Sequence, residues 1–153
     1  MPLPDDQIED LALKWASGDK DAARFLVNFM AMVRLADDIA DGDSENPVAD
    51  MSNLLVRAWI DHGTNPFFQA HSGALSASMA NAVLMWEKSE EWRHSENEKT
   101  RMFAFVVRET VEHVAYTCAM LTGGYSHAKS VAQEIQEVSH QRSPETFADW
   151  EAE

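Results

Sequence analysis

Residues 19–42, DKDAARFLVNFMAMVRLADDIADG, decide the fold class of this 153-residue chain. Leu26, Met30 and Val33 follow one another at steps of four and three, which places their side chains on one face of an α-helix. Asp19 is suited to cap the first turn, and Gly42 is suited to end the helix. The stretch therefore predicts an amphipathic helix from about residue 19 to residue 41.

Glycines, prolines and capping residues divide the rest of the chain into further helices. The sequence contains no alternating strand pattern and no hairpin turn between apolar runs. The other expected helices are 5–16, 47–63, 66–93, 99–121 and 126–138, with a short one after Pro144. We predict an all-α fold, a single-domain bundle of about five to seven helices that spans residues 1–153.

The composition disfavours several classes of function. Twenty-six acidic residues against twelve lysines and arginines give a net charge of −14, which disfavours direct binding to nucleic acid or to anionic membrane. No apolar run approaches the roughly 20 residues needed to span a bilayer. The single cysteine, Cys118, cannot form an internal disulfide, and residues 1–10 lack the pattern of a secretory signal. We therefore expect a cytoplasmic protein.

An aspartate cluster ends the helix predicted at 19–41. Asp37 and Asp41 are four residues apart and continue the row of Val33, so we expect them to point the same way as the core side chains. Two like charges that face inward near the negative end of a helix are unfavourable through repulsion, desolvation and the helix dipole. A divalent cation, Mg²⁺ or Mn²⁺, bound by Asp37, Asp38 and Asp41 would neutralise them. Arg34, one turn earlier, could share that task. The alternative is that these acids are simply solvated at a helix end.

A second acidic pair lies in the helix predicted at 99–121. Glu109 and Glu112 are three residues apart and share a face, and Arg108 beside them is one of the few nearby bases that could meet a diphosphate. Because one helix seldom completes a metal shell, we expect these glutamates to face the aspartates across the bundle core and to bind metal with them. The alternative is an ordinary exposed helix face.

The segment Arg34-Leu35-Ala36-Asp37-Asp38-Ile39-Ala40-Asp41 resembles the first aspartate-rich motif of the class I isoprenoid synthases, in particular squalene and phytoene synthases. The resemblance implies that Asp37, Asp38 and Asp41 bind Mg²⁺ ions that hold a substrate diphosphate. It also implies that Arg34 is a diphosphate or charge partner. Glu109 and Glu112 would stand in for the second acidic helix of that family, which carries aspartates. The resemblance covers only this short motif.

The chain also resembles the all-α nucleotide pyrophosphohydrolases of the MazG and dimeric dUTPase type. That resemblance rests on Asp38-x-x-Asp41 and Glu109-x-x-Glu112, since those enzymes are small, helical and oligomeric and bind Mg²⁺ between paired acidic helices. It implies a catalytic role for Glu109 or Glu112, which would orient the attacking water.

Two functions from different classes follow from these patterns. The first is a Mg²⁺-dependent protein that binds or processes a diphosphate-containing small molecule. The second is a non-catalytic acidic interaction or inhibitor protein, a class that includes nucleic-acid mimics, and it is favoured by the net charge and the few bases. Acids that converge inside the fold favour the first function, and acids dispersed over the surface favour the second. The tryptophan and methionine content is compatible with a homodimer in either case.

Overall fold

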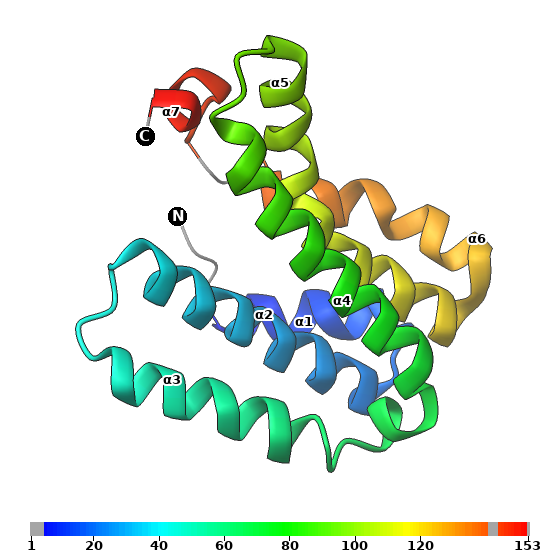
Figure 1. Ribbon diagram of the computed structural model, residues 1–153. Helices are drawn as coiled ribbons and strands as arrows, with labels where there is room; N and C mark the ends of the chain where they lie inside the picture. Colours follow the sequence, from blue (N-terminus) through cyan, green and yellow to red (C-terminus); the bar gives the residue numbers. More distant parts are fainter. Residues whose placement is uncertain (1–4, 141–143, 153) are drawn as a thin grey trace. The chain divides into compact units, whose positions relative to one another are not determined.

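The computed structural model describes residues 5–140 and 144–152, and this part of the chain is helical without any strand. Its α-helices are α1 (Asp5–Trp15), α2 (Lys20–Asp41), α3 (Pro47–Val56), α4 (Pro66–Arg93), α5 (Glu98–Val107), α6 (His113–His140) and α7 (Phe147–Ala152) (Figure 1). A π-helical turn, η1 (Arg57–Asp61), continues α3, and a 3-10 turn, η2 (Arg108–Glu112), joins α5 to α6. The prediction of an all-α fold with five to seven helices is confirmed. None of the described helices is long and apolar enough to cross a membrane.

The chain forms two compact units. The N-terminal unit contains α1, α2, α3, η1 and the first turns of α4, up to Ser72. The C-terminal unit contains α4 from Gly73 onward, followed by α5, η2, α6 and α7. Within α4 the backbone leaves helical geometry at His71 (φ −124°, ψ 21°), directly before this boundary. The expectation of a single domain over residues 1–153 stays a prediction.

The N-terminal unit is built on α2. The predicted cap is confirmed, because Asp19 Oδ1 accepts hydrogen bonds from the backbone N–H groups of Asp21 and Ala22, both at 2.9 Å. Gly42 ends α2 in the left-handed conformation with φ 80°, which glycine adopts without strain. A short turn joins α1 to α2, and the two helices pack along each other (Figure 1). Helix α3 and η1 form one continuous helical segment that also runs along α2.

Burial along α2 is uneven. All its buried residues lie between Ala22 and Phe29, whereas Met30 and Val33 of the predicted apolar row are only half-buried. Helix α2 has 22 residues and its hairpin partner α1 has 11. The C-terminal half of α2 therefore extends past α1, and this half carries the aspartate cluster.

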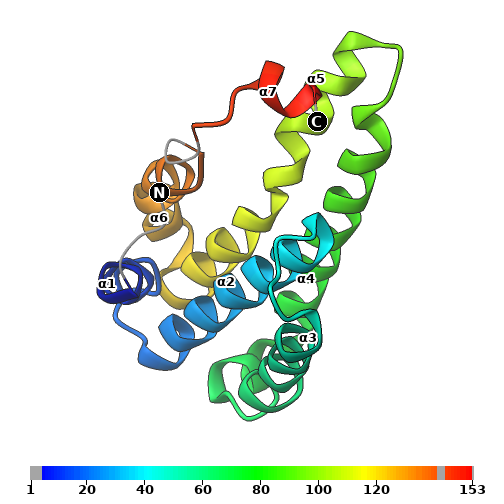
Figure 2. The same ribbon diagram turned by 90° about the vertical axis from the view of Figure 1, so that its left-hand side faces the viewer.

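The C-terminal unit places α4 beside α5 and the first half of α6 (Figure 2). Trp92 contacts Phe103 with ring centroids 5.9 Å apart, and the Thr117 hydroxyl donates to Ser78 Oγ at 3.2 Å. The helix predicted at 99–121 is interrupted by η2, which lies between α5 and α6. The boundary predicted between the helices at 99–121 and 126–138 is confirmed, because Gly124 has φ 79° and ψ 178° inside α6.

Aromatic and cationic side chains attach α7 to the rest of this unit. The Trp150 side chain is 1% exposed, and its ring centroid lies 5.5 Å from that of Phe105. The Arg93 guanidinium lies over the Trp150 ring at 4.4 Å, and Arg101 is paired with Glu151. Trp150 thus anchors a helix too short to be stable alone.

Candidate functional site

The aspartate cluster lies at the exposed end of α2. Asp37 and Asp41 are exposed, so the expectation that these two carboxylates point into the core is wrong, and Asp38 between them is half-buried. The physical reason is the length of α2, whose last turns extend past the hairpin with α1. Arg34, the expected diphosphate partner, is also exposed on this half of the helix.

The second acidic pair lies on η2 and is engaged by protein groups. Glu109 Oε1 lies 3.2 Å from Arg108 Nε, and Arg108 Nη2 donates to Glu145 at 2.6 Å. The Glu112 side chain is 7% exposed, and its Oε2 accepts a hydrogen bond from the Tyr116 hydroxyl at 3.2 Å. Burial, together with the neighbouring charge of Glu112, raises the pKa of Tyr116 to about 12. Arg108, Glu109 and Glu112 thus all contact other protein groups, and their catalytic and diphosphate-binding roles stay predictions.

Neither the aspartates at the end of α2 nor the glutamates of η2 form, among the described residues of their own unit, a group of three ligands for a metal. Across residues 5–140 and 144–152, no three His, Cys, Asp or Glu side chains come together as a group that could bind a metal. The aspartates belong to the N-terminal unit and the glutamates to the C-terminal unit. Mg²⁺ needs a near-octahedral set of oxygens, which neither acidic group supplies within its own unit. The metal site stays a prediction from sequence spacing.

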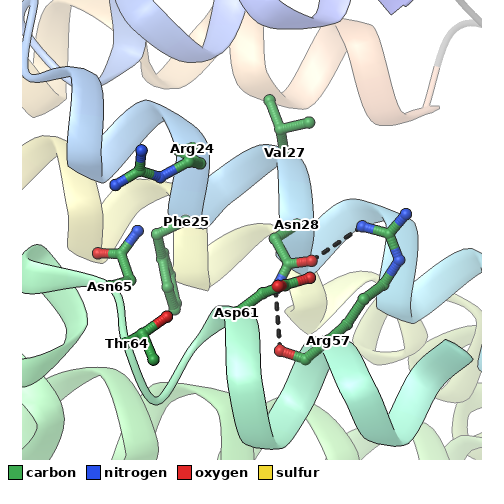
Figure 3. A pocket seen from close by; sticks show the side chains of 8 residues that line it. All are labelled: Arg24, Phe25, Val27, Asn28, Arg57, Asp61, Thr64 and Asn65. Atoms are coloured by element: carbon green, nitrogen blue, oxygen red, sulfur yellow. Dashed lines mark hydrogen bonds between the residues drawn. The ribbon is translucent and has the colours of Figure 1, made fainter.

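A cavity of about 480 Å³ lies between α2 and the segment from η1 to the start of α4 (Figure 3). Its polar lining consists of Arg24, Asn28, Arg57, Asp61, Thr64 and Asn65. Phe25 and Val27 supply the apolar part of the wall. This volume lies within the range of small-molecule sites, which combine apolar walls with a few convergent polar groups.

Asn28 and Arg57 form the central contact of this cavity. Arg57 Nη1 donates to Asn28 Oδ1 at 2.9 Å, and Asn28 Nδ2 donates to the Arg57 carbonyl oxygen at 3.2 Å (Figure 3). The same carbonyl accepts from the His62 N–H at 3.0 Å, five residues later, which is the hydrogen bond of a π-helical turn. Such turns are uncommon and occur often at functional sites.

The far wall of the cavity is fixed by Asn65, which is 3% exposed. Its Nδ2 donates to the Asp21 carbonyl at 2.9 Å, and its Oδ1 accepts from the Phe68 N–H at 3.1 Å. The second bond caps α4 at the start of the helix predicted at 66–93, where an asparagine before a proline is a common start signal. Because both ends of the amide are used, this wall is rigid before any ligand arrives.

His62 is buried directly behind the cavity wall. Its ring stacks on Phe25 with centroids 4.6 Å apart and on Phe68 at 5.6 Å. Burial lowers the pKa of His62, against the smaller opposing effects of a backbone hydrogen bond with Phe25 and the charge of Asp61. Among the described residues, no protein group forms a hydrogen bond with His62 Nε2.

Large apolar side chains are exposed along α3 and η1. Val48 is 78% exposed and Trp59 is 72% exposed, and no residue of α3 is buried. We call the exposed side chains of Val48, Met51, Val56, Trp59 and Ile60 the apolar stripe. Met51 follows Val48 by three residues and Ile60 follows Val56 by four, spacings that bring the members of each pair together on the helix surface.

Acidic residues surround this stripe in sequence. Between residues 37 and 61 the acids are Asp37, Asp38, Asp41, Asp43, Glu45, Asp50 and Asp61. Arg57 is the single base in the same interval. The surface formed by the end of α2, α3 and η1 therefore combines exposed apolar groups with a strong negative charge.

Sequence reasoning missed both the cavity and the stripe. Asn28 is a polar residue inside the apolar run Val27–Phe29, which was the one available signal for a buried polar contact. Asn65 directly precedes the helix predicted at 66–93, and nothing in the sequence marks it as part of a cavity wall. Arg57 and Asp61 have no local signal, since the residues that line the cavity opposite them lie on α2, about thirty positions earlier in the chain.

No protein-family model, curated protein or solved structure matches this chain. The function must therefore be inferred from the residues and geometry of the chain itself.

Proposed function

We propose that this chain is a non-catalytic acidic interaction protein that binds a basic amphipathic segment of a partner protein through the apolar stripe. The 72% exposure of Trp59 within an acidic stretch carries this proposal. Exposed apolar patches rimmed by polar residues are typical of interaction sites. Tryptophan is enriched among the few residues that dominate interface energies.

Charge determines which kind of partner fits. Seven acids and one base between residues 37 and 61 attract lysines and arginines and repel acidic proteins. An amphipathic helix with a basic face offers both an apolar row for the stripe and cations for its acidic surroundings. A nucleic-acid mimic needs only the negative charges, because the polymer it imitates presents phosphates. The apolar stripe therefore favours a protein segment as the partner.

A binding assay with a defined probe tests the proposal. The probe is a fluorescein-labelled amphipathic helical peptide of leucine and lysine, and its anisotropy is measured at low ionic strength. We expect binding, with Trp59→Ala weakening the affinity about tenfold. Trp86→Ala is the matched control, because Trp86 is another exposed tryptophan, 42% exposed on α4 and outside the stripe. A peptide with glutamate in place of lysine should not bind. Equal affinity for the wild type and the Trp59 variant would overturn the proposal.

The magnesium–diphosphate function stays a prediction from Asp37, Asp38 and Asp41, and a thermal melt separates it from the proposed function. The protein is melted with EDTA, with Mg²⁺, and with Mg²⁺ plus pyrophosphate. An interaction protein without a metal site gains no stability from these additions. A rise in Tm that requires both ligands and is lost in the Asp37→Ala, Asp41→Ala variant would establish a metal–diphosphate site instead.

The homodimer also stays a prediction. Two copies would each have a net charge of −14, and this repulsion opposes contact between their acidic surfaces. Sedimentation of the protein without the peptide measures self-association directly.

A further inference from the structure

We propose that the cavity between α2 and η1 is a binding site for a small organic monocarboxylate with an apolar body, and that Arg57 binds its carboxylate. The site is separate from the apolar stripe, whose side chains do not line the cavity. Three features carry the inference: a fixed guanidinium with an unused edge, rigid polar walls, and an apolar patch beside them.

The Arg57 guanidinium is held in place without a carboxylate partner. Nη1 donates to Asn28 Oδ1 at 2.9 Å and Nε donates to Asn53 Oδ1 at 3.1 Å, so both acceptors are neutral amides. Within the described residues no protein atom accepts from Nη2, and Arg57 forms no ion pair. In a protein with 26 acids and a net charge of −14, a positioned arginine that lacks an acidic partner is unexpected.

Arg24, the other arginine of the cavity, differs in this respect. Its Nη2 is 2.5 Å from Asp21 Oδ1, and its side chain is 65% exposed. It contributes positive potential at the rim, whereas Arg57 is the cation with donors left for a ligand. A carboxylate suits this group, because the planar guanidinium forms parallel hydrogen bonds to its two oxygens.

The walls around Arg57 are organised in advance. Asn28 and Asn65 are 7% and 3% exposed, and each amide already has defined partners on both its oxygen and its nitrogen. A site with fixed polar groups binds with less loss of conformational entropy than a mobile one.

The remaining lining selects among anions. Val27, which is half-buried, provides an apolar surface for the body of a ligand, which inorganic phosphate lacks; Phe25 is 0% exposed and only backs this wall. Asp61 also lines the cavity, and its negative charge opposes a doubly charged phosphate more strongly than a singly charged carboxylate. A hydroxyl or amino group on the ligand could donate to Asp61. The cavity of about 480 Å³ has room for a molecule of this class.

Calorimetric titration of the full chain with sodium phenylacetate tests the site. We expect binding that weakens about tenfold in Arg57→Gln, since a charge-assisted hydrogen bond is lost. Lys20→Gln is the charge-matched control, because Lys20 is exposed on α2 and does not line the cavity, and it should bind as the wild type does. Phenylethanol, which has the ring without the carboxylate, should not bind, and inorganic phosphate should bind more weakly than phenylacetate.

A second measurement uses only the wild-type protein, so that a folding defect in the variant does not decide the outcome. Phenylacetate should shift the side-chain amide resonances of Asn28 and Asn65 in a ¹H–¹⁵N spectrum. Absence of these shifts at millimolar phenylacetate, or equal affinity for Arg57→Gln, would overturn the proposal. Phosphate binding as tightly as phenylacetate would also overturn it.

Discussion

Asn28 on α2 and Arg57 at the start of η1 are 29 positions apart in sequence and exchange two hydrogen bonds. The Asn28 amide accepts from the Arg57 guanidinium and donates to the carbonyl of the same residue. One buried side chain thus holds both the backbone and the cation of Arg57. This contact joins α2 to the π-helical turn, and both residues line the cavity.

Replacing Asn28 with alanine should lower the free energy of unfolding by about 1–3 kcal/mol, because two hydrogen bonds to a partly buried partner are lost. Asn53→Ala is the matched control, since it removes one exposed hydrogen bond to the same guanidinium and should cost less than about 1 kcal/mol. Urea unfolding, monitored by circular dichroism, measures the free energy of unfolding of both variants. Equal losses would contradict the central role of Asn28.

The pH dependence of stability should contain a contribution from His62. Burial lowers its pKa in the folded state below the ordinary value of 6.5, so the unfolded chain binds the proton more readily. This contribution to stability is complete above about pH 6.5 and is lost as the pH falls below that value. In His62→Gln, the fall in stability between about pH 7.5 and 5.5 should be smaller than in the wild type. Parallel pH profiles of wild type and variant would refute this assignment.

Trp150 should be the main anchor of α7. Trp150→Ala removes a side chain that is 1% exposed and packs between Phe105 and Arg93, and it should lower stability by about 3–5 kcal/mol. Trp150→Phe keeps part of the aromatic contact and should lose less. Trp59→Ala is the control for an exposed tryptophan. Its ring is 72% exposed, so its loss should change the free energy of unfolding by less than about 0.5 kcal/mol.

The two ends of α2 should respond in opposite directions to the same change of charge. The last turn of α2 contains no base, and Asp41 is exposed there, so Asp41→Lys should raise stability by about 0.3–1 kcal/mol through the helix dipole. Asp21 lies in the first turn and pairs with Arg24, so Asp21→Lys should lower stability. Thermal melts at low and high salt measure both effects. Loss of stability in Asp41→Lys would instead favour a structural role for that carboxylate.

Cys118 should be inert in the folded protein. Its side chain is 0% exposed, and burial raises the pKa of its thiol well above the ordinary range. A thiol-reactive disulfide reagent at about pH 8 should modify it slowly in the native state and rapidly in urea. Rapid modification without denaturant would show that α6 opens easily at this position.

The helices and their ends could be predicted from sequence because their causes are local. Asp19 caps α2 as predicted, Asn46 caps α3 in the same way, and Gly42 and Gly124 end or break their helices with positive φ. A cap acts through hydrogen bonds two or three residues away, and a glycine acts through its own dihedral angles. The buried position of Cys118, four residues after the buried Val114 on α6, also follows helical spacing.

The sites could not be predicted in the same way, since they depend on segments that are distant in sequence. Helical spacing puts Asp37 and Asp41 on the same face of α2 as Val33. How far along α2 this face is buried depends on the length of α1 relative to α2. Similarly, Glu112 is buried beside Tyr116 on a 3-10 turn that no local signal marked. The periodicity of a helix determines which side chains share a face, and only its neighbours determine whether that face meets protein or water.

The sequence by itself thus determined an acidic, all-α chain with its helices and caps, because these follow from composition and from contacts within a few residues. The tertiary structure alone decided the π-helical turn, the cavity and the exposure of Trp59. Each of these arises from how α2 packs against α3 and η1, where hydrogen bonds such as that of Asn28 with Arg57 join residues far apart in the chain.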